Sequence, residues 1–473
     1  MLKCLGTRQR FAGVALAALL AMLCFWGLGD VPLLSTNEAR RAVSVREMYA
    51  SGEWLLPRMN GEPYLTKPPL FNWLALLPTS LLGSANEWAV RLPSAILGLL
   101  LLLGTYLLGT RIGGRATGYF ACLFLAANAG FSLLARRAEI EMTLAAFCGF
   151  AIIFAWHYLF HDPSKRWSRL SHACLGGALL TKGPVALLLV TLPIGTYYLV
   201  TRDRRAKALL GDGPGWLVAF GIGGWWYCWM MATQGLTIWQ STLQEDIVKK
   251  IDTATGEPWF AYLGYLAGDF FPYWLVVLVR PVAWLRAARS NPQLILLGCV
   301  ALVPLTLFSV FDEKHAKYLL PIYPALSVLL AWQANRLLAV AAGWRRKILV
   351  LTPTVMLCAY VLFYAFAEAR LRQHRIAALP LIDQVLDRHR QQALYSLGEP
   401  DMRLVYYANR LVHPLSIEQV YTLAASEDLL FVNGPLPTSL NYLAPCIRQR
   451  FRPYLRQNKE AVLIQMAGKC SRD

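Results

Sequence analysis

Long apolar segments separated by short polar loops dominate the first 370 residues of the chain. A helix of roughly 20 apolar residues is long enough to cross a bilayer. The apolar segments fall at residues 11–29, 91–110, 116–134, 141–160, 172–181, 184–200, 215–233, 261–285, 293–310, 318–335 and 348–367. Stretches near 38–50 and 65–83 fit shallow helices at the membrane interface in the first outer loop. The pattern predicts a polytopic α-helical membrane protein with about eleven to thirteen transmembrane helices.

Composition and charge agree with this class. Hydrophobic residues make up 56% of the chain and charged residues only 16%, whereas a soluble domain carries about 25% charged residues. The net charge of +18 comes largely from loops between apolar segments, as the positive-inside bias predicts, so we expect membrane lipids rather than nucleic acid as the partner of these residues. Because Lys3, Arg8 and Arg10 precede the first apolar segment, we expect a cytoplasmic N-terminus, and an odd number of spans would export the C-terminus.

The composition changes near residue 370, which predicts a transmembrane domain over 1–368 and a small soluble α/β domain over 369–473. The expected elements are a helix at 379–391 and strands at Leu404–Tyr407, Leu429–Val432 and Ala461–Gln465. Two cysteines, Cys446 and Cys470, lie in this exported segment, where the redox conditions permit a disulfide. The sequence leaves open whether they pair, since it does not give their separation.

Acidic residues on the predicted outer face are few, so a functional and a structural role can be compared for each. Glu38 opens an expected helix, where a carboxylate also has a simple structural role at the positive end of the dipole. Glu139 and Glu141 follow two arginines, with which an ordinary ion pair is a fair alternative. Basic groups on the same face include Lys67, Lys182, Lys249, Lys250, Lys314, His315 and Lys317. Each lysine alone could simply extend to the membrane surface, but together they could hold an anion such as the phosphate of a lipid carrier.

Several short motifs occur in order between residues 37 and 324. They are Asn37-Glu38-Ala39-Arg40, Ser51-Gly52-Glu53-Trp54, Tyr64-Leu65-Thr66-Lys67-Pro68-Pro69, Arg91-Leu92-Pro93-Ser94, Glu141-Met142-Thr143-Leu144, Leu179-Leu180-Thr181-Lys182-Gly183-Pro184 and Lys317-Tyr318-Leu319-Leu320-Pro321-Ile322-Tyr323-Pro324. As a set they resemble the glycosyltransferase C superfamily, in particular the bacterial branch that includes 4-amino-4-deoxy-L-arabinose lipid A transferases. Protein O-mannosyltransferases are more distant relatives.

The resemblance implies transfer of a sugar from a polyprenyl (undecaprenyl) phosphate donor to an acceptor at the periplasmic face of the bacterial inner membrane. The family's first acidic pair is usually Asp-Glu, but this chain has Asn37-Glu38, so the resemblance assigns the base to Glu38 and the second acid to Glu141. The donor phosphate would be bound by Tyr64, Lys67, Lys249 and Tyr318. Supporting roles fall on Arg40, Arg137, Lys182, Lys314 and Lys317.

The chemistry implied here needs few groups. A lipid phosphate leaves as a stable anion, so the enzyme must activate the acceptor and stabilise the departing charge. No cofactor is required, and no metal site is indicated, although a divalent ion stays possible. A single displacement would invert the anomeric carbon. The acceptor could be lipid A, another envelope glycan or a protein, and a transporter or a non-catalytic protein on the same scaffold are the other classes.

Overall fold

The computed structural model describes residues 7–235, 257–373, 378–422, 427–443, 446–452, 454–455 and 459–465. Its contacts divide the chain into two compact units. The first, called the helical unit, contains Met1–Trp26, Leu65–Leu74 and Arg91–Phe363. The second, called the mixed unit, contains Gly27–Tyr64, Ala75–Val90 and Tyr364–Asp473. Each unit is described separately below.

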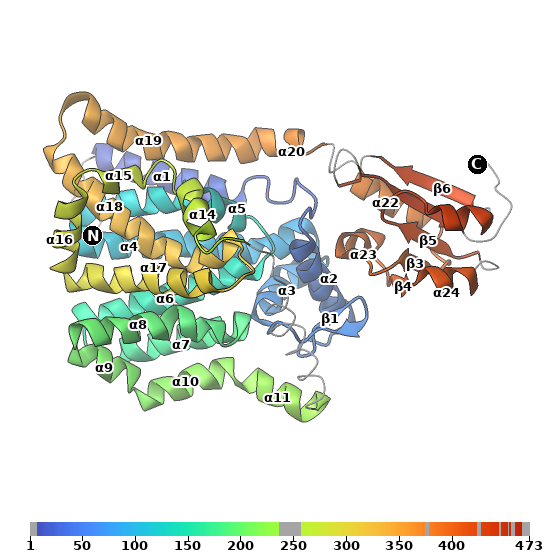
Figure 1. Cartoon of the computed structure of the whole chain (residues 1–473), viewed down its shortest axis with the longest axis horizontal. Helices are drawn as coiled ribbons and strands as arrows, with labels where there is room; N and C mark the ends of the chain where they lie inside the picture. Colours follow the sequence, from blue (N-terminus) through green and yellow to red (C-terminus); the bar gives the residue numbers. More distant parts are fainter. Residues whose placement is uncertain are drawn as a thin grey trace. The chain divides into compact units, whose positions relative to one another are not determined.

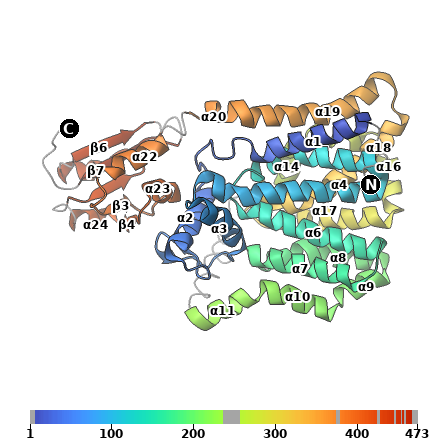
Figure 2. The ribbon, with the colours of Figure 1, turned by 180° about the vertical axis from the view of Figure 1, so that it is seen from behind.

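The helical unit is a bundle of apolar helices (Figure 1; seen from behind in Figure 2). Some contacts join successive helices, such as α6 with α7 and α17 with α18. Others join helices further apart in the chain, such as α7 with α10 and α8 with α17. The described helices are α1 (Thr7–Phe25), α4 (Glu87–Ala126), α5 (Ala129–Leu134), α6 (Ile140–Phe160), α7 (Lys165–Lys182), α8 (Val185–Thr201), α9 (Arg204–Leu210), α10 (Gly213–Gly223), α11 (Trp225–Gln234), α14 (Ala261–Asp269), α15 (Leu275–Leu278), α16 (Pro281–Arg289), α17 (Pro292–Val310), η3 (Ala316–Ile322), α18 (Tyr323–Val340) and α19 (Gly343–Leu362).

The prediction of several apolar helices is confirmed. Among the described residues, four helices are long and apolar enough to cross a membrane, at Glu87–Ala126, Ile140–Phe160, Pro292–Val310 and Gly343–Leu371. Shorter apolar helices include Gly13–Phe25 and Val185–Thr201. The count of eleven to thirteen spans stays a prediction.

Several predicted spans differ from the helices observed; for example, residues 215–233 are divided between α10 and α11, and residues 318–335 between η3 and α18. Residues 261–285 do not form one helix, because Pro272 and Pro281 lack the N–H that a continuous helix requires, and the segment is divided among α14, α15 and α16. Residues 116–134 are also interrupted. The side chain of Asn128 accepts a hydrogen bond from Phe131 N at 2.9 Å, so it caps a new helix, α5, and ends the preceding one.

The mixed unit contains a five-stranded sheet in the order β4-β3-β5-β7-β6. Strands β4 (His413–Leu415), β3 (Leu394–Leu397) and β5 (Leu429–Val432) are parallel, while β7 (Ala461–Gln465) and β6 (Cys446–Phe451) continue the sheet in antiparallel fashion. The remaining described elements are α2 (Thr36–Ser51), β1 (Arg58–Met59), β2 (Glu62–Pro63), α3 (Leu70–Leu82, shared by the two units), η4 (Phe363–Ala367), α20 (Glu368–Leu371), α22 (Ala378–Asp387), α23 (Met402–Ala408), α24 (Ile417–Thr422) and η5 (Thr438–Leu443). The first turn of α4 also belongs to this unit.

The predicted helix at 379–391 and the predicted strands Leu429–Val432 and Ala461–Gln465 are confirmed. The prediction of a strand at Leu404–Tyr407 is wrong, because these residues belong to helix α23. Asp401 caps that helix by accepting a hydrogen bond from Arg403 N at 2.9 Å. The buried residues Met402, Val405 and Ala408 recur every third position, which is a helical spacing.

One hydrophobic core joins helix α2 to the C-terminal segment. Ala39 and Val43 of α2 are fully buried in a cluster whose other members all come from residues beyond 377. They include Leu379, Ile382, Leu386, Leu404, Val405, Val412, Leu429, Phe431 and Leu463. The division at residue 368 stays a prediction, but the apolar surface of the C-terminal segment is covered by α2 within the mixed unit.

Candidate active site

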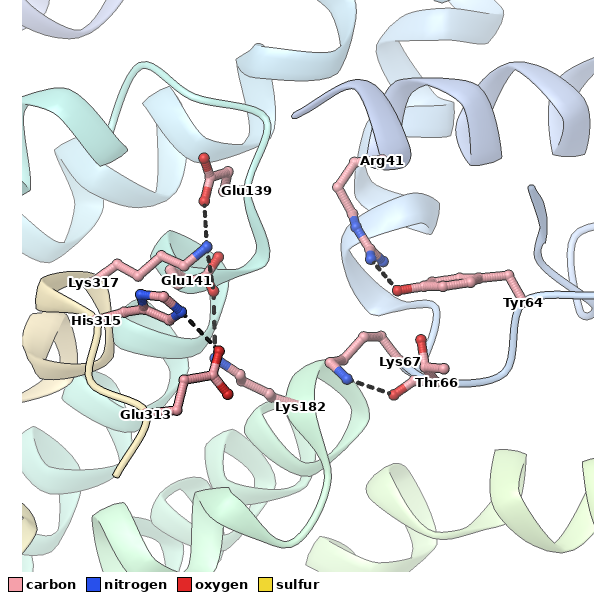
Figure 3. A network of polar contacts seen from close by, with 10 residues as sticks. All are labelled: Arg41, Tyr64, Thr66, Lys67, Glu139, Glu141, Lys182, Glu313, His315 and Lys317. Atoms are coloured by element: carbon pink, nitrogen blue, oxygen red, sulfur yellow. Dashed lines mark hydrogen bonds and ion pairs between the residues drawn. The ribbon is translucent and has the colours of Figure 1, made fainter. Parts of the chain in front are cut away.

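Two glutamates and two lysines meet where three elements of the helical unit end or begin (Figure 3). Glu139 precedes α6 and Glu141 lies in its first turn, where the helix dipole favours a negative charge. Lys182 is the last residue of α7, and Lys317 lies in η3. Lys182 Nζ is 3.3 Å from Glu141 Oε1, and Lys317 Nζ is 3.0 Å from Glu139 Oε2 and 3.5 Å from Glu141 Oε1. We call these four residues the carboxylate–lysine cluster.

The cluster is largely buried. Side-chain exposure is 7% for Glu141 and 17% for Lys182, so water screens their attraction much less than at an open surface. Desolvation lowers the pKa of Lys317, but the nearby carboxylates of Glu141 and Glu139 outweigh it and raise that pKa above its ordinary value. Lys317 is therefore held in its charged form.

Further groups surround the cluster. The ring of Tyr318 lies under Lys182, with Nζ 4.4 Å from the ring centroid, a cation–π contact. Lys67 Nζ donates to Thr66 O at 2.9 Å, and the charge of Lys67 acts on Lys182. Lys67, Lys182 and Lys317 therefore bring three ammonium groups to this end of the helical unit. An anion such as a phosphate would be attracted to them.

In the mixed unit, the predicted base Glu38 is fully buried in the first turn of α2. The side chain of Ser35 caps this helix by accepting from Asn37 N at 3.2 Å. Tyr64 accepts a hydrogen bond from Arg41 Nη2 at 2.5 Å, and the guanidinium of Arg41 lies 4.9 Å from its ring centroid (Figure 3).

Arg41 is a residue that the sequence interpretation missed. It is buried, whereas its predicted neighbour Arg40 is exposed. The spacing could have distinguished them, because Glu38, Arg41 and Val45 follow the three- and four-residue steps of one helix face. We therefore infer that Arg41, rather than Arg40, supports the ring of Tyr64.

The other predicted residues lie as follows. Arg137 is buried in the turn before α6. Its neighbour Arg136 donates to Leu23 O at 2.8 Å and Trp26 O at 2.7 Å, which satisfies carbonyls at the end of α1. Lys314 is buried and donates to Phe311 O at 2.6 Å and Glu257 O at 3.2 Å, so two of its donors are engaged by backbone carbonyls. Lys249 and Lys250 fall outside the described residues.

Two further expectations from the sequence concern metal binding and a disulfide. Within the described ranges, no group of three or more His, Cys, Asp or Glu side chains is arranged to hold a metal ion. His315 Nε2 lies 2.9 Å from Glu313 Oε1 beside the cluster (Figure 3), a pair rather than a coordination set. Cys446 is disulfide-bonded. Cys470, whose pairing with Cys446 the sequence left open, lies outside the described residues.

The sequence is similar to known membrane glycosyltransferases. The family of dolichyl-phosphate-mannose-protein mannosyltransferases matches residues 66–222. The undecaprenyl phosphate-alpha-4-amino-4-deoxy-L-arabinose arabinosyl transferase of Pseudomonas savastanoi pv. phaseolicola is 31% identical over 347 residues, which cover 69% of this chain and 61% of that protein. A relative with the same activity in its name, from Sodalis glossinidius, is 30% identical and covered to 54% of its length. The chain thus spans less than two thirds of these curated relatives.

Solved structures share the fold over nearly the whole chain. The crystal structure of ArnT from Cupriavidus metallidurans bound to undecaprenyl phosphate has a TM-score of 0.79 at 20% identity, covering 97% of this chain and 98% of that one. The archaeal oligosaccharyltransferase AglB from Archaeoglobus fulgidus, in complex with an inhibitory peptide and a dolichol-phosphate, has a TM-score of 0.58 at 11% identity, with coverage of 93% and 71%.

The predicted resemblance is confirmed by both kinds of similarity. The matched residues 66–222 contain Glu139, Glu141 and Lys182 of the carboxylate–lysine cluster. The chain is therefore similar in sequence to the lipid-carrier-dependent glycosyltransferases of the glycosyltransferase C superfamily, and it has their fold.

Proposed function

We propose that this protein is an integral membrane glycosyltransferase that moves a sugar from a polyprenyl-phosphate donor to an acceptor in the bacterial envelope. The observation that carries the proposal is the carboxylate–lysine cluster, in which Lys182 and Lys317 converge on Glu141. The ammonium groups of Lys67, Lys182 and Lys317 suit the phosphate of a lipid carrier. The similarity to undecaprenyl-phosphate-dependent transferases supports the same donor class.

The proposed reaction is a single displacement. An acceptor oxygen attacks the anomeric carbon, the bond from that carbon to the phosphate oxygen breaks, and polyprenyl phosphate leaves with the bonding electrons. The acceptor's proton passes to a carboxylate, for which Glu38 is the first candidate. Because the leaving phosphate gains negative charge, Lys67, Lys182 and Lys317 would stabilise the transition state more than the bound donor. Tyr64, Tyr318 and Lys249 would complete the phosphate site.

Glu141 has a positioning role in this scheme. Its carboxylate accepts from Lys182 at 3.3 Å, and Lys317 lies 3.5 Å from the same oxygen. Without that anchor the two ammonium groups would repel each other and separate. Glu141 therefore keeps both cations beside the position of the leaving phosphate.

The acceptor and the cellular location follow from the same similarity. Relatives whose names specify transfer of 4-amino-4-deoxy-L-arabinose favour lipid A or another envelope glycan as the acceptor, with a protein as the alternative. The protein would lie in the inner membrane, with its N-terminus in the cytoplasm and the C-terminal segment in the periplasm. Mass analysis of lipid A and of glycoproteins from cells with and without the gene would distinguish these acceptors.

The direct test is transfer by the purified full-length protein from a polyprenyl-phosphate sugar. Glu38→Gln removes the proposed base while keeping the side-chain shape, and Glu53→Gln is the matched control, since Glu53 is an exposed carboxylate of the same loop. We expect Glu38→Gln to lose transfer and Glu53→Gln to retain it. Full activity of Glu38→Gln would exclude this base. Failure of the unchanged protein with every polyprenyl donor would instead favour a transporter or a non-catalytic protein.

A further inference from the structure

The side chain of Asn60, in the turn between β1 and β2, forms two hydrogen bonds with the C-terminal segment. Asn60 Nδ2 donates to Val412 O at 2.7 Å, and Val412 N donates to Asn60 Oδ1 at 2.9 Å. Val412 is fully buried and directly precedes β4. The amide of Asn60 thus pairs with both backbone groups of one residue, as a neighbouring strand would.

The same turn is also held by α2. The carboxylate of Glu47 accepts from Asn60 N at 2.8 Å and from Gly61 N at 3.0 Å. Both turn residues have a positive φ, 57° for Asn60 and 83° for Gly61, which only Gly and, less easily, Asn tolerate. Asn60 therefore links α2, the hairpin and the start of β4 in one place.

The hairpin ends in Tyr64, the tyrosine proposed to bind the donor phosphate. Tyr64 N donates to Pro57 O at 2.7 Å and closes the hairpin. On the other side, Arg41 of α2 donates to the Tyr64 hydroxyl. The hairpin and α2 both support Tyr64, and both are fixed to the C-terminal segment, so a change where they meet that segment would move the ring of Tyr64.

We propose that Asn60 is a positioning residue for the donor: it couples the C-terminal segment to Tyr64 and so fixes the place of that hydroxyl. This inference rests on the proposed function, in which Tyr64 binds the phosphate. It gives the C-terminal segment a role in donor binding, through the two hydrogen bonds between Asn60 and Val412.

Two substitutions separate the backbone requirement from the side-chain bonds. Asn60→Gly keeps a residue that accepts positive φ but removes both bonds to Val412. Asn60→Asp keeps an acceptor for Val412 N and places a carboxylate oxygen against Val412 O, where no hydrogen bond can form. The matched control is Glu62→Gln, an exposed position on the same hairpin.

The experiment measures binding of polyprenyl phosphate to the full-length protein in detergent. We expect Asn60→Gly to raise Kd about tenfold, equivalent to about 1.4 kcal/mol, Asn60→Asp to raise it by a similar factor, and Glu62→Gln to leave it unchanged. In a Tyr64→Phe background, Asn60→Gly should have little further effect, because both changes act through one hydroxyl. Thermal unfolding checks that each variant is folded, and if Asn60→Gly melts early then Asn60→Asp carries the test.

Two results would overturn the inference alone. One is that the unchanged protein binds polyprenyl phosphate and that the Asn60 variants bind it with the same Kd as Glu62→Gln. The other is a full tenfold effect of Asn60→Gly added to that of Tyr64→Phe, which would show that Asn60 acts independently of Tyr64. Absence of binding by the unchanged protein would overturn the proposed function itself.

Discussion

Replacing Glu141 by Gln should destabilise the helical unit, because two largely buried lysines would then face an uncharged amide. Lys182 Nζ and Lys317 Nζ lie 3.3 Å and 3.5 Å from the same carboxylate oxygen. Lys317 keeps a second partner, Glu139, at 3.0 Å. The loss therefore falls mainly on Lys182.

The magnitude follows from the distances and the burial. Two unit charges about 3.4 Å apart attract each other by roughly 5 kcal/mol at an effective dielectric constant of about 20. Desolvation offsets much of that attraction, and removing one partner of a buried pair costs about 3–5 kcal/mol in practice. We expect a loss of about 3 kcal/mol for Glu141→Gln, which lowers Tm by roughly 3–5 °C.

The assay is thermal unfolding of the full-length protein in detergent, followed for Glu141→Gln, Lys182→Met and the double variant. Removing both partners leaves no uncompensated charge, so the double variant should be more stable than Glu141→Gln alone. The control is Glu313→Gln, which removes a more exposed ion pair with His315 and should cost at most about 1 kcal/mol.

Two results would refute this reasoning. A Tm for Glu141→Gln equal to that of the unchanged protein would mean that the carboxylate does not hold Lys182. A double variant whose loss equals the sum of the two single losses would mean that Glu141 and Lys182 contribute separately, despite their short distance.

Four further predictions test other parts of the structure. Arg136→Met should destabilise the protein by about 2–4 kcal/mol, measured as a fall in Tm, because Leu23 O and Trp26 O lose charged donors. Incubation with EDTA should leave sugar transfer unchanged, since lysines rather than a metal stabilise the leaving phosphate in the proposed scheme. The pKa of Lys317 is raised in the folded state, so the stability that its charge contributes is complete below its ordinary pKa of 10.5 and is lost as pH rises through the higher folded value. The Tm of the unchanged protein should therefore fall above pH 10.5 by more than the Tm of Lys317→Met. Asn37→Asp restores the acid usual in the family, and it should increase transfer in the purified-protein assay if position 37 faces the acceptor.

Much of the helical unit could be predicted from the sequence. Apolar segments of spanning length locate the helices, and the charged residues at their ends locate the expected outer face, which is how Glu141 and Lys182 were identified. Their convergence also follows, since α6 and α7 are joined by a short loop and must pack side by side. The pairing of Lys317 with both glutamates could not be predicted, because it depends on where η3 lies against α6.

Contacts between distant parts of the chain explain most of the remaining differences. The burial of Ala39 and Val43 against residues beyond 377 joins segments separated by more than 300 residues, and no local pattern encodes such a contact. Arg136 is another example, since its basic charge suggested an ion pair, while its donors reach the end of α1. Residues Leu404–Tyr407 have the composition of a strand, but Asp401 caps a helix just before them, and they fold as part of α23.

The first acidic pair shows how burial changes the interpretation of a motif. Asn37, at the position of the family's usual acid, is exposed, whereas Glu38 is fully buried at the start of α2. A buried carboxylate in the first turn also stabilises its own helix, particularly in the spacing Ser35-x-x-Glu38 of a capping box. Glu38→Gln therefore separates two roles, because glutamine can still serve in a capping box but cannot accept the proton: a base loses transfer while Tm is largely kept, whereas a residue that only anchors the helix keeps both transfer and most of Tm. Only the first outcome would make Glu38 the proton acceptor, and the second would leave the exposed position 37 as the place where this chain departs from the family that it resembles.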